Sequence, residues 1–124
     1  MNLLIQNSKR LGWIVLVVLI GTLFDYLVHA SNETFAVPDY YFRHKLIYAV
    51  VWIAVGTAVF WKVRPLLWKA VLVTGFFAII LQTRYFFAGY PIWFVLLFMG
   101  VHGITFGVPL YLVFRHERRL FGVR

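Results

Sequence analysis

Four long apolar runs, separated by short polar connections, dominate this chain of 124 residues. They cover residues 11–30, 46–61, 66–88 and 92–114. A helix needs about 20 mostly apolar residues to cross the hydrocarbon core of a membrane, and a small soluble domain cannot bury this much apolar surface. Unpaired backbone polar groups are costly in lipid, so each run should be a helix. The sequence therefore predicts one all-α domain over residues 1–124, a polytopic integral membrane protein with a four-transmembrane-helix bundle.

The basic residues predict the orientation of this bundle. Three of the twelve, Arg43, Lys45 and Arg84, fall at one end of the runs, and nine fall at the other end: Lys9, Arg10, Lys62, Arg64, Lys69, Arg115, Arg118, Arg119 and Arg124. The positive-inside rule then places both termini in the cytoplasm. The net charge of +8 is read as a topology signal with anionic lipid headgroups as counterions, not as a nucleic-acid-binding surface. We expect a multi-pass protein of the cell (plasma) membrane.

Residues 1–30 also admit a second interpretation, as a cleaved signal peptide with basic residues, an apolar core and a weak cleavage site at Ala30. The apolar run is long for a signal peptide. Asp25 and its aromatic neighbours also occupy the region just before the site. These features favour a first span that is retained.

Several polar side chains interrupt the apolar runs near the outer end, opposite the basic one. Asp25 lies five residues before the end of the first run, about 7 Å deep, and His29 follows one helical turn later on the same face. Ionisable residues inside a membrane are candidates for function. The side chains expected at this outer level form one candidate pocket: Asp25, His29, His44, Tyr48, Gln82 and Arg84.

One hypothesis makes this pocket a metal site with Asp25, His29 and His44 as ligands. Imidazole and carboxylate together suit zinc or copper, and a three-ligand set is common. The spacing, Asp-x3-His-x14-His, is similar to the Asp-His-His copper site in the membrane subunit of particulate methane and ammonia monooxygenases, in these three residues alone. The resemblance implies copper as the metal. Four short helices with 20% aromatic residues and no visible soluble domain also fit an accessory subunit, here of a larger membrane metalloenzyme.

A second hypothesis makes Asp25 a proton carrier in an oligomeric proton-coupled transporter or channel for a small solute. His102 lies about ten residues into the fourth run, near the bilayer midplane by helical rise. Thr22 and Thr105 are the hydroxyls that would relay a proton between the outer pocket and this histidine. A third hypothesis is purely structural, in which Asp25 pairs with Arg84 and holds helices together.

The sequence gives little support for other functional classes. Phosphate-binding loops and the motifs of serine hydrolases and zinc proteases are absent. A haem held by two histidines needs a matching pair at one depth, and His102 has no partner at its level. We therefore expect copper or zinc rather than haem, and a homo-oligomer or a subunit of a membrane complex rather than an enzyme acting by itself.

Overall fold

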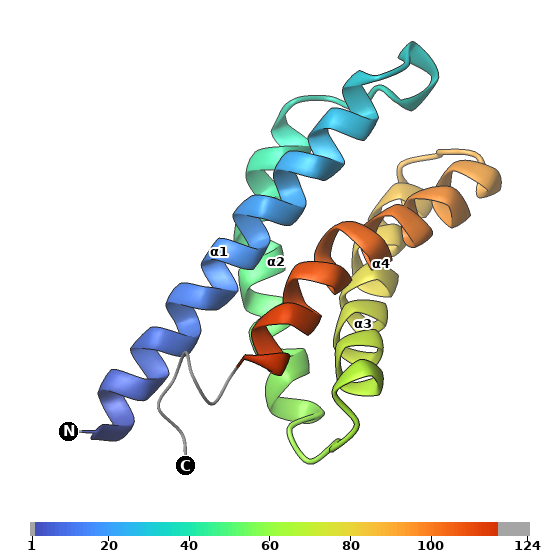
Figure 1. Ribbon diagram of the computed structural model, residues 1–124. Helices are drawn as coiled ribbons and strands as arrows, with labels where there is room; N and C mark the ends of the chain where they lie inside the picture. The colour runs from blue at the N-terminus through green and yellow to red at the C-terminus, as the bar shows by residue number, and fades with distance from the viewer. Residues whose placement is uncertain (1, 117–124) are drawn as a thin grey trace.

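A computed structural model describes the backbone of residues 2–116, and side chains from Leu4 onward, as four long helices joined by short connections (Figure 1). All four helices are long and apolar enough to cross a membrane. This confirms the all-α, four-helix prediction, while membrane insertion and the cytoplasmic position of the termini stay predictions. The elements in chain order are α1 (Asn2–Ala30), a 3₁₀ turn η1 (Glu33–Phe35), α2 (Tyr40–Val59), α3 (Leu66–Phe87) and α4 (Ile92–Arg115).

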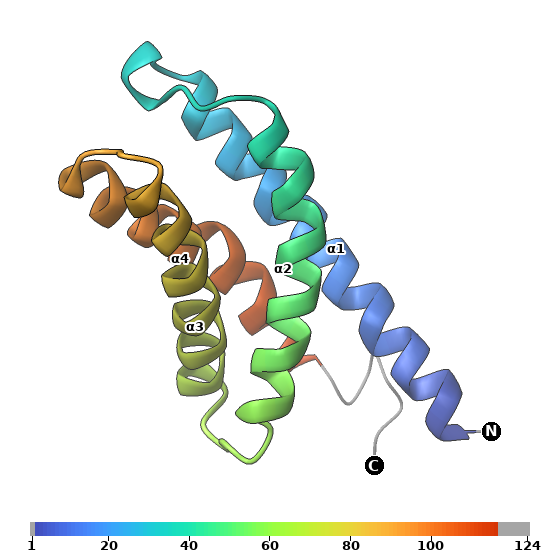
Figure 2. The ribbon, with the colours of Figure 1, turned by 180° about the vertical axis from the view of Figure 1, so that it is seen from behind.

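The helices run alternately up and down, so the connections fall at two opposite ends (Figures 1 and 2). The start of α1, the α2–α3 connection and the end of α4 form what we call the basic end. Residues 31–39 and the α3–α4 turn form the opposite loop end. The predicted clustering of basic residues agrees with this arrangement for those that are described, and Arg118, Arg119 and Arg124 lie outside the described residues. The basic end carries Lys9, Arg10, Lys62, Arg64, Lys69 and Arg115.

Helix α2 begins at Tyr40, six residues before the expected start of the second span at Leu46. The apolar run alone set the predicted boundary, whereas the helix continues into residues 40–45, which are aromatic and basic. Pro38 precedes the helix, and its carbonyl accepts the first turn hydrogen bond, from Tyr41 at 3.0 Å. The consequence is that Lys45 lies within the helix, with a defined face, and not in a surface connection.

The turn between α3 and α4 is short, as the Gly-Tyr-Pro sequence predicts. Gly89 has φ of +87°, a left-handed conformation that side chains with a Cβ rarely adopt. This residue reverses the chain, and Pro91 then directly precedes α4. The turn brings the loop-end halves of α3 and α4 side by side.

The interior consists of two apolar clusters with polar side chains between them. Along α4 the buried residues recur every four positions, and His102 falls between Phe98 on the loop-end side and Phe106 on the basic-end side. The loop-end cluster comprises Tyr41, Tyr85, Phe94, Val95 and Phe98. The basic-end cluster comprises Val17, Val18, Ala49, Ile53, Ala70, Val73, Phe77, Leu81, Phe106, Leu110 and Phe114. The polar layer between them is the candidate site.

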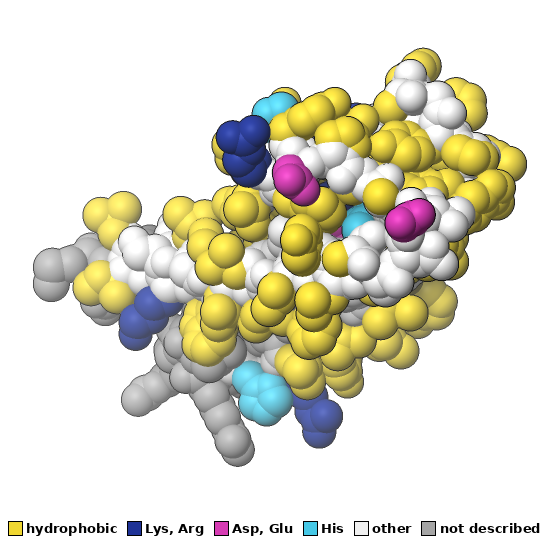
Figure 3. Space-filling model, turned by 90° about the horizontal axis from the view of Figure 1, so that it is seen from above, with side chains coloured by type: hydrophobic (Ala, Val, Ile, Leu, Met, Phe, Trp, Pro, Cys, Tyr) yellow, Lys and Arg dark blue, Asp and Glu magenta, His cyan; other side chains and the backbone are white. Residues whose placement is uncertain are grey.

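The outer surface is largely apolar. Large hydrophobic side chains are exposed along all four helices, and Phe87 at the loop end is 80% exposed. Viewed from the loop end, hydrophobic side chains cover most of the molecule (Figure 3). Such a surface suits lipid as the surrounding solvent.

Candidate functional site

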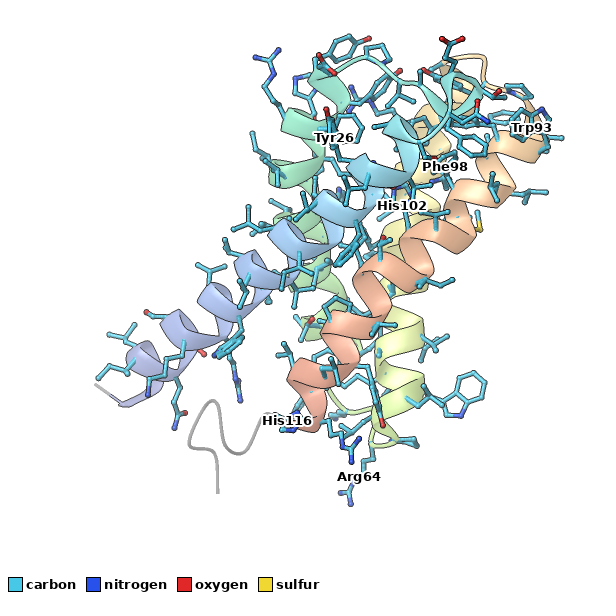
Figure 4. All side chains as sticks on the ribbon, turned by 45° about the horizontal axis from the view of Figure 1, so that its top comes forward. Tyr26, Arg64, Trp93, Phe98, His102 and His116 are labelled. Carbon is cyan, nitrogen blue, oxygen red and sulfur yellow. The ribbon has the colours of Figure 1, made fainter. Side chains whose placement is uncertain are left out.

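Asp25 is the centre of the polar layer. Its side chain, carried by α1, is fully buried and forms an ion pair with Lys45 of α2, whose Nζ donates to Oδ2. The other carboxylate oxygen, Oδ1, lies 3.3 Å from His102 Nε2 and 3.6 Å from His29 Nε2. One carboxylate is therefore shared by a lysine and two histidines from three different helices. Figure 4 shows His102 on α4, turned toward the bundle interior.

Lys45 uses its full donor capacity inside this layer. Besides Asp25, its ammonium group lies 3.2 Å from the Tyr85 hydroxyl and 3.1 Å from His102 Nε2. An ammonium has three N–H donors, so each has a buried partner. Lysine is rarely buried unless it is paired. This one is 2% exposed, which makes its charge and that of Asp25 interdependent.

The position of Lys45 follows from the period of α2. Its buried residues, Tyr41, Lys45, Ala49 and Ile53, recur every four positions on one helix face. Helix-packing faces commonly carry small residues, as Ala49 does here. The lysine on this stripe therefore points at α1 and α4 and not at the surface.

Two neighbours face the two ring nitrogens of His102. Gln82 Nε2 lies 2.6 Å from Nδ1, and Lys45 Nζ lies 3.1 Å from Nε2. A neutral imidazole has one donor and one acceptor nitrogen, and the two ends of a glutamine amide are assigned from the hydrogen-bond network. With the Gln82 amide turned over, its oxygen accepts from Nδ1–H and Nε2 accepts from Lys45. This orientation also gives a partner to Gln82 Oε1, which is otherwise buried and unpaired.

His102 Nε2 thus lies between a donor and an acceptor. Lys45 can donate to it, and it can itself donate a proton to Asp25 Oδ1. Only the location of one proton distinguishes these two arrangements. Such a geometry is suited to exchanging a proton among three buried groups.

His29 extends the network toward the loop end. Its Nδ1 donates to the Phe35 carbonyl at 2.5 Å, since a carbonyl can only accept. This fixes the tautomer, so Nε2 of the neutral ring presents a lone pair toward Asp25 Oδ1. The ring is stacked on Phe98, with centroids 4.0 Å apart. In this tautomer two hydrogen-bond acceptors, His29 Nε2 and Asp25 Oδ1, face each other. Protonation of His29 would make Nε2 a charged donor to this carboxylate oxygen.

An aromatic cover lies between the network and the loop end. Tyr85 and Phe98 are completely or almost completely buried, and Phe94 packs on both Tyr90 and Phe98, with centroids 4.7 and 4.5 Å apart. Tyr90 belongs to the α3–α4 turn, and burial, followed by the nearby Tyr41, raises the pKa of its hydroxyl. In the view from the loop end a histidine side chain is visible in a recess between other side chains (Figure 3).

Unpaired polar atoms gather around the same layer. Among the described residues, the buried side-chain atoms that have no hydrogen-bond partner are Thr22 Oγ1, Asp25 Oδ1, His29 Nε2, Gln82 Oε1 and Thr105 Oγ1. Buried polar atoms are normally paired, so each exception calls for an explanation. Thr22 precedes Asp25 by three residues and Thr105 follows His102 by three, so both lie about one turn toward the basic end.

His44 and Arg84 do not join this layer. Because Lys45 faces the interior, the preceding residue is turned away by about 100° and faces outward. Arg84 donates to His44 Nδ1 at 3.1 Å and lies over the Tyr41 ring at 4.3 Å. The single pocket expected from sequence is therefore two separate sites. We call them the buried network (Asp25, His29, Lys45, Gln82, Tyr85 and His102) and the outer groove (His44, Tyr48, Trp52, Ile80, Leu81 and Arg84).

For the metal hypothesis, the structure brings two of the three predicted ligands together. Asp25 and His29 are neighbours, but His44 is exposed and is bonded to Arg84 in the outer groove. Between residues 2 and 116, no group of three histidine or acidic side chains is arranged to hold a metal ion. Copper or zinc binding stays a prediction, as does a role as accessory subunit.

Lys45 and Tyr85 are the site residues that sequence reasoning missed. A signal for both existed in the spacing of buried positions: Lys45 continues the stripe of Tyr41 and Ala49, and Tyr85 continues that of Phe77 and Leu81. His102 was expected at a deeper level than Asp25. The two residues meet because α1 extends beyond the α3–α4 turn at the loop end (Figure 1). The same number of residues from the loop end of α1 and of α4 therefore corresponds to different depths in the bundle.

Comparison with known proteins adds no functional identity. No protein-family model matches the chain, and neither a curated protein nor a solved structure shows significant similarity to it. Function must therefore be argued from the chemistry of the buried network.

Proposed function

We propose that this protein is a small membrane transporter in which the buried network takes up and releases the proton that drives transport. The observation that carries the proposal is Asp25, a fully buried carboxylate held by Lys45 and two histidines between apolar layers. Such residues are costly in a membrane protein and mark ion and proton pathways. An alternating-access carrier or a channel for a small solute would use this site for coupling.

The charges in the network favour a proton over a metal ion as its ligand. Lys45 already supplies a positive charge to Asp25, and a divalent cation bound to that carboxylate would lie beside an ammonium group. At 4 Å and an effective dielectric constant of about 20, two unit charges repel by about 4 kcal/mol, and a divalent ion doubles this energy. A proton, in contrast, can move among Asp25, Lys45 and His102 without adding a second cation.

A structural role alone accounts less well for these residues. Replacing a buried ion pair with apolar side chains of similar volume is often neutral or stabilising. A chain that is 63% hydrophobic could hold its helices together by packing alone. The buried hydroxyls of Thr22 and Thr105, which have no hydrogen-bond partner among the described residues, would add cost without benefit in a static support, whereas water or a transported solute could use them.

The positions of these atoms also support a path for the proton. His29 would provide the outer access, since its ring lies between the Phe35 carbonyl, on the loop-end side, and Asp25. Thr22 and Thr105 would continue the path toward the basic end, where the larger apolar cluster must open during transport. Transport therefore requires a second conformation in which α1 and α4 separate along Thr22 and Thr105.

The test is proton movement in proteoliposomes loaded with a pH-sensitive dye. A potassium gradient with valinomycin drives protons through a channel, and outward gradients of amino acids, sugars, organic acids and amines each test a carrier. We expect wild-type flux under at least one of these conditions and its loss in Asp25→Asn. His116→Gln is the matched control, because His116 lies at the end of α4, is exposed and contacts the Leu112 carbonyl.

Two results would overturn the proposal. One is wild-type protein that moves no protons above protein-free liposomes under any of these gradients. The other is an Asp25→Asn variant that folds and retains the wild-type flux. Circular dichroism and gel filtration of each variant separate a loss of transport from a loss of folding.

A further inference from the structure

The outer groove lies between α2 and α3 and is separate from the buried network. It is a cavity of about 420 Å³, lined by His44, Tyr48, Trp52, Ile80, Leu81 and Arg84. None of these residues takes part in the hydrogen bonds of Asp25 or Lys45. The groove therefore has a chemistry of its own, which the transport proposal does not use.

The polar end of the groove presents donors for an anion. Arg84 donates one N–H to His44 Nδ1, which fixes the His44 tautomer with its proton on Nε2. The guanidinium carbon lies 4.3 Å from the centroid of the Tyr41 ring. A guanidinium has five N–H donors, so four remain after the hydrogen bond to His44. Among the described residues, Arg84 forms no ion pair with a carboxylate. Two adjacent donors, one with a full positive charge, are thus left without an anion.

The position of these donors along the helices matches the headgroup level of a bilayer. His44 is four residues from the start of α2, and Arg84 is three residues from the end of α3. Both therefore lie within about 6 Å of the loop end of their helices. Arginine and aromatic side chains are common at this depth, where phosphates are found.

The rest of the groove is apolar and extends deeper. Tyr48 and Trp52 follow His44 at intervals of four residues, and Ile80 precedes Arg84 by four, so each pair shares a helix face. Trp52 lies about 12 Å deeper than His44 along α2. Phe76 packs edge-on against Trp52, with ring centroids 6.0 Å apart, and holds this wall in place. A cationic end continued by an apolar slot is complementary to an amphiphile.

We propose that the outer groove binds an anionic phospholipid, with its phosphate on Arg84 and His44 and one acyl chain against Trp52 and Ile80. The charge of the guanidinium selects the phosphate, and the planar fork gives two parallel hydrogen bonds to it. The aromatic wall selects a lipid over a water-soluble phosphate. The bound lipid would fill the seam between α2 and α3 next to the aromatic cover.

The experiment is a titration of the detergent-purified protein with phosphatidylglycerol, followed by native mass spectrometry. We expect one phospholipid to bind well above the level of further copies. Arg84→Gln should weaken this binding about tenfold, because the glutamine amide can replace one of the two hydrogen bonds to the phosphate but not the charge. Arg43→Gln is the matched control, since Arg43 is an exposed arginine one residue from His44 that does not line the groove. It should retain wild-type affinity.

A second variant tests the acyl slot. Trp52→Ala should weaken binding of long-chain phosphatidylglycerol more than that of the dihexanoyl form, whereas Arg84→Gln should weaken both equally. Equal affinities for Arg84→Gln and Arg43→Gln would overturn the proposal. So would displacement of the lipid by millimolar inorganic phosphate, or a groove occupied by a second copy of the chain in a lipid-free dimer.

Discussion

Removing the charge of Lys45 should destabilise the protein more than removing the charge of Lys69, a second buried lysine whose contact is an aromatic ring. In Lys45→Met the side-chain volume is nearly kept, but Asp25 Oδ2 loses its donor, and the Tyr85 hydroxyl and His102 Nε2 lose theirs. Asp25 is fully buried, so water cannot replace the ammonium group without opening the bundle. The carboxylate is left as an uncompensated charge between two apolar clusters.

The expected cost follows from this environment. Breaking a buried ion pair by removing one partner costs about 3–5 kcal/mol, while replacing both partners with well-packed apolar side chains of similar volume is often neutral or stabilising. Lys45→Met should therefore lower the free energy of unfolding by about 3–5 kcal/mol. The double variant Lys45→Met with Asp25→Asn should recover most of this loss, because its remaining polar atoms carry no charge.

The assay is equilibrium unfolding in mixed micelles, with SDS as denaturant and tryptophan fluorescence and far-ultraviolet circular dichroism as probes. Lys69→Met provides the matched control: Lys69 is also buried, on α3, but its contact is the Phe114 ring at 4.6 Å. A buried cation–π contact of this kind is worth about 2 kcal/mol, less than the cost expected for Lys45→Met. The reasoning is refuted if Lys45→Met stays within 1 kcal/mol of Lys69→Met, or if the double variant is no more stable than the single one.

Two further predictions concern packing and pH. Gly21→Ala should destabilise the fold by about 1–3 kcal/mol, because a Cβ there would lie 2.6 Å from the Phe106 ring. Gly100→Ala is the control and should leave stability unchanged, because the space around its Cβ position is open. Equal unfolding midpoints of the two variants in SDS would contradict the prediction. Burial beside Tyr41 raises the pKa of Tyr90, so its contribution to stability is complete below about pH 10 and is lost as pH rises through its higher folded value. Tyr90→Phe should therefore lose less unfolding free energy than wild type between pH 9 and pH 11, and parallel losses in the two proteins would contradict it.

The fold could be predicted from the sequence because one physical constraint dominates it. Apolar runs of this length admit helices and little else in lipid, and short connections make successive helices antiparallel. The ends of the helices could be predicted less well than their number. Hydropathy marks where the apolar run begins, at Leu46, whereas the helix begins at Tyr40, just after Pro38. That error of six residues concealed the orientation of Lys45.

The site could be predicted only in part, because side-chain partners depend on helix rotation as well as depth. Asp25 and His29 were correctly placed together by the i, i+4 rule, which acts within one helix. Whether His44 or Lys45 faces Asp25 depends on a rotation of about 100° of α2, which the buried stripe through Ala49 and Ile53 determines. Depth counted from helix ends likewise could not reveal that His102 reaches Asp25.

Lys45 also separates the two chemistries that the sequence suggested for Asp25. If the network handles protons, the lysine is a member of it, and Lys45→Met should abolish coupled flux along with the exchange among Asp25, Lys45 and His102. If Asp25 instead belongs to a metal site, the ammonium opposes the metal, and the same substitution should raise the affinity for Zn²⁺ or Cu²⁺. Lys45→Met therefore distinguishes the two hypotheses: proton handling predicts a loss of coupled flux, and metal binding predicts a gain in metal affinity. The ion pair with Asp25 gives the physical reason, since a carboxylate already neutralised by a buried lysine attracts a divalent cation weakly.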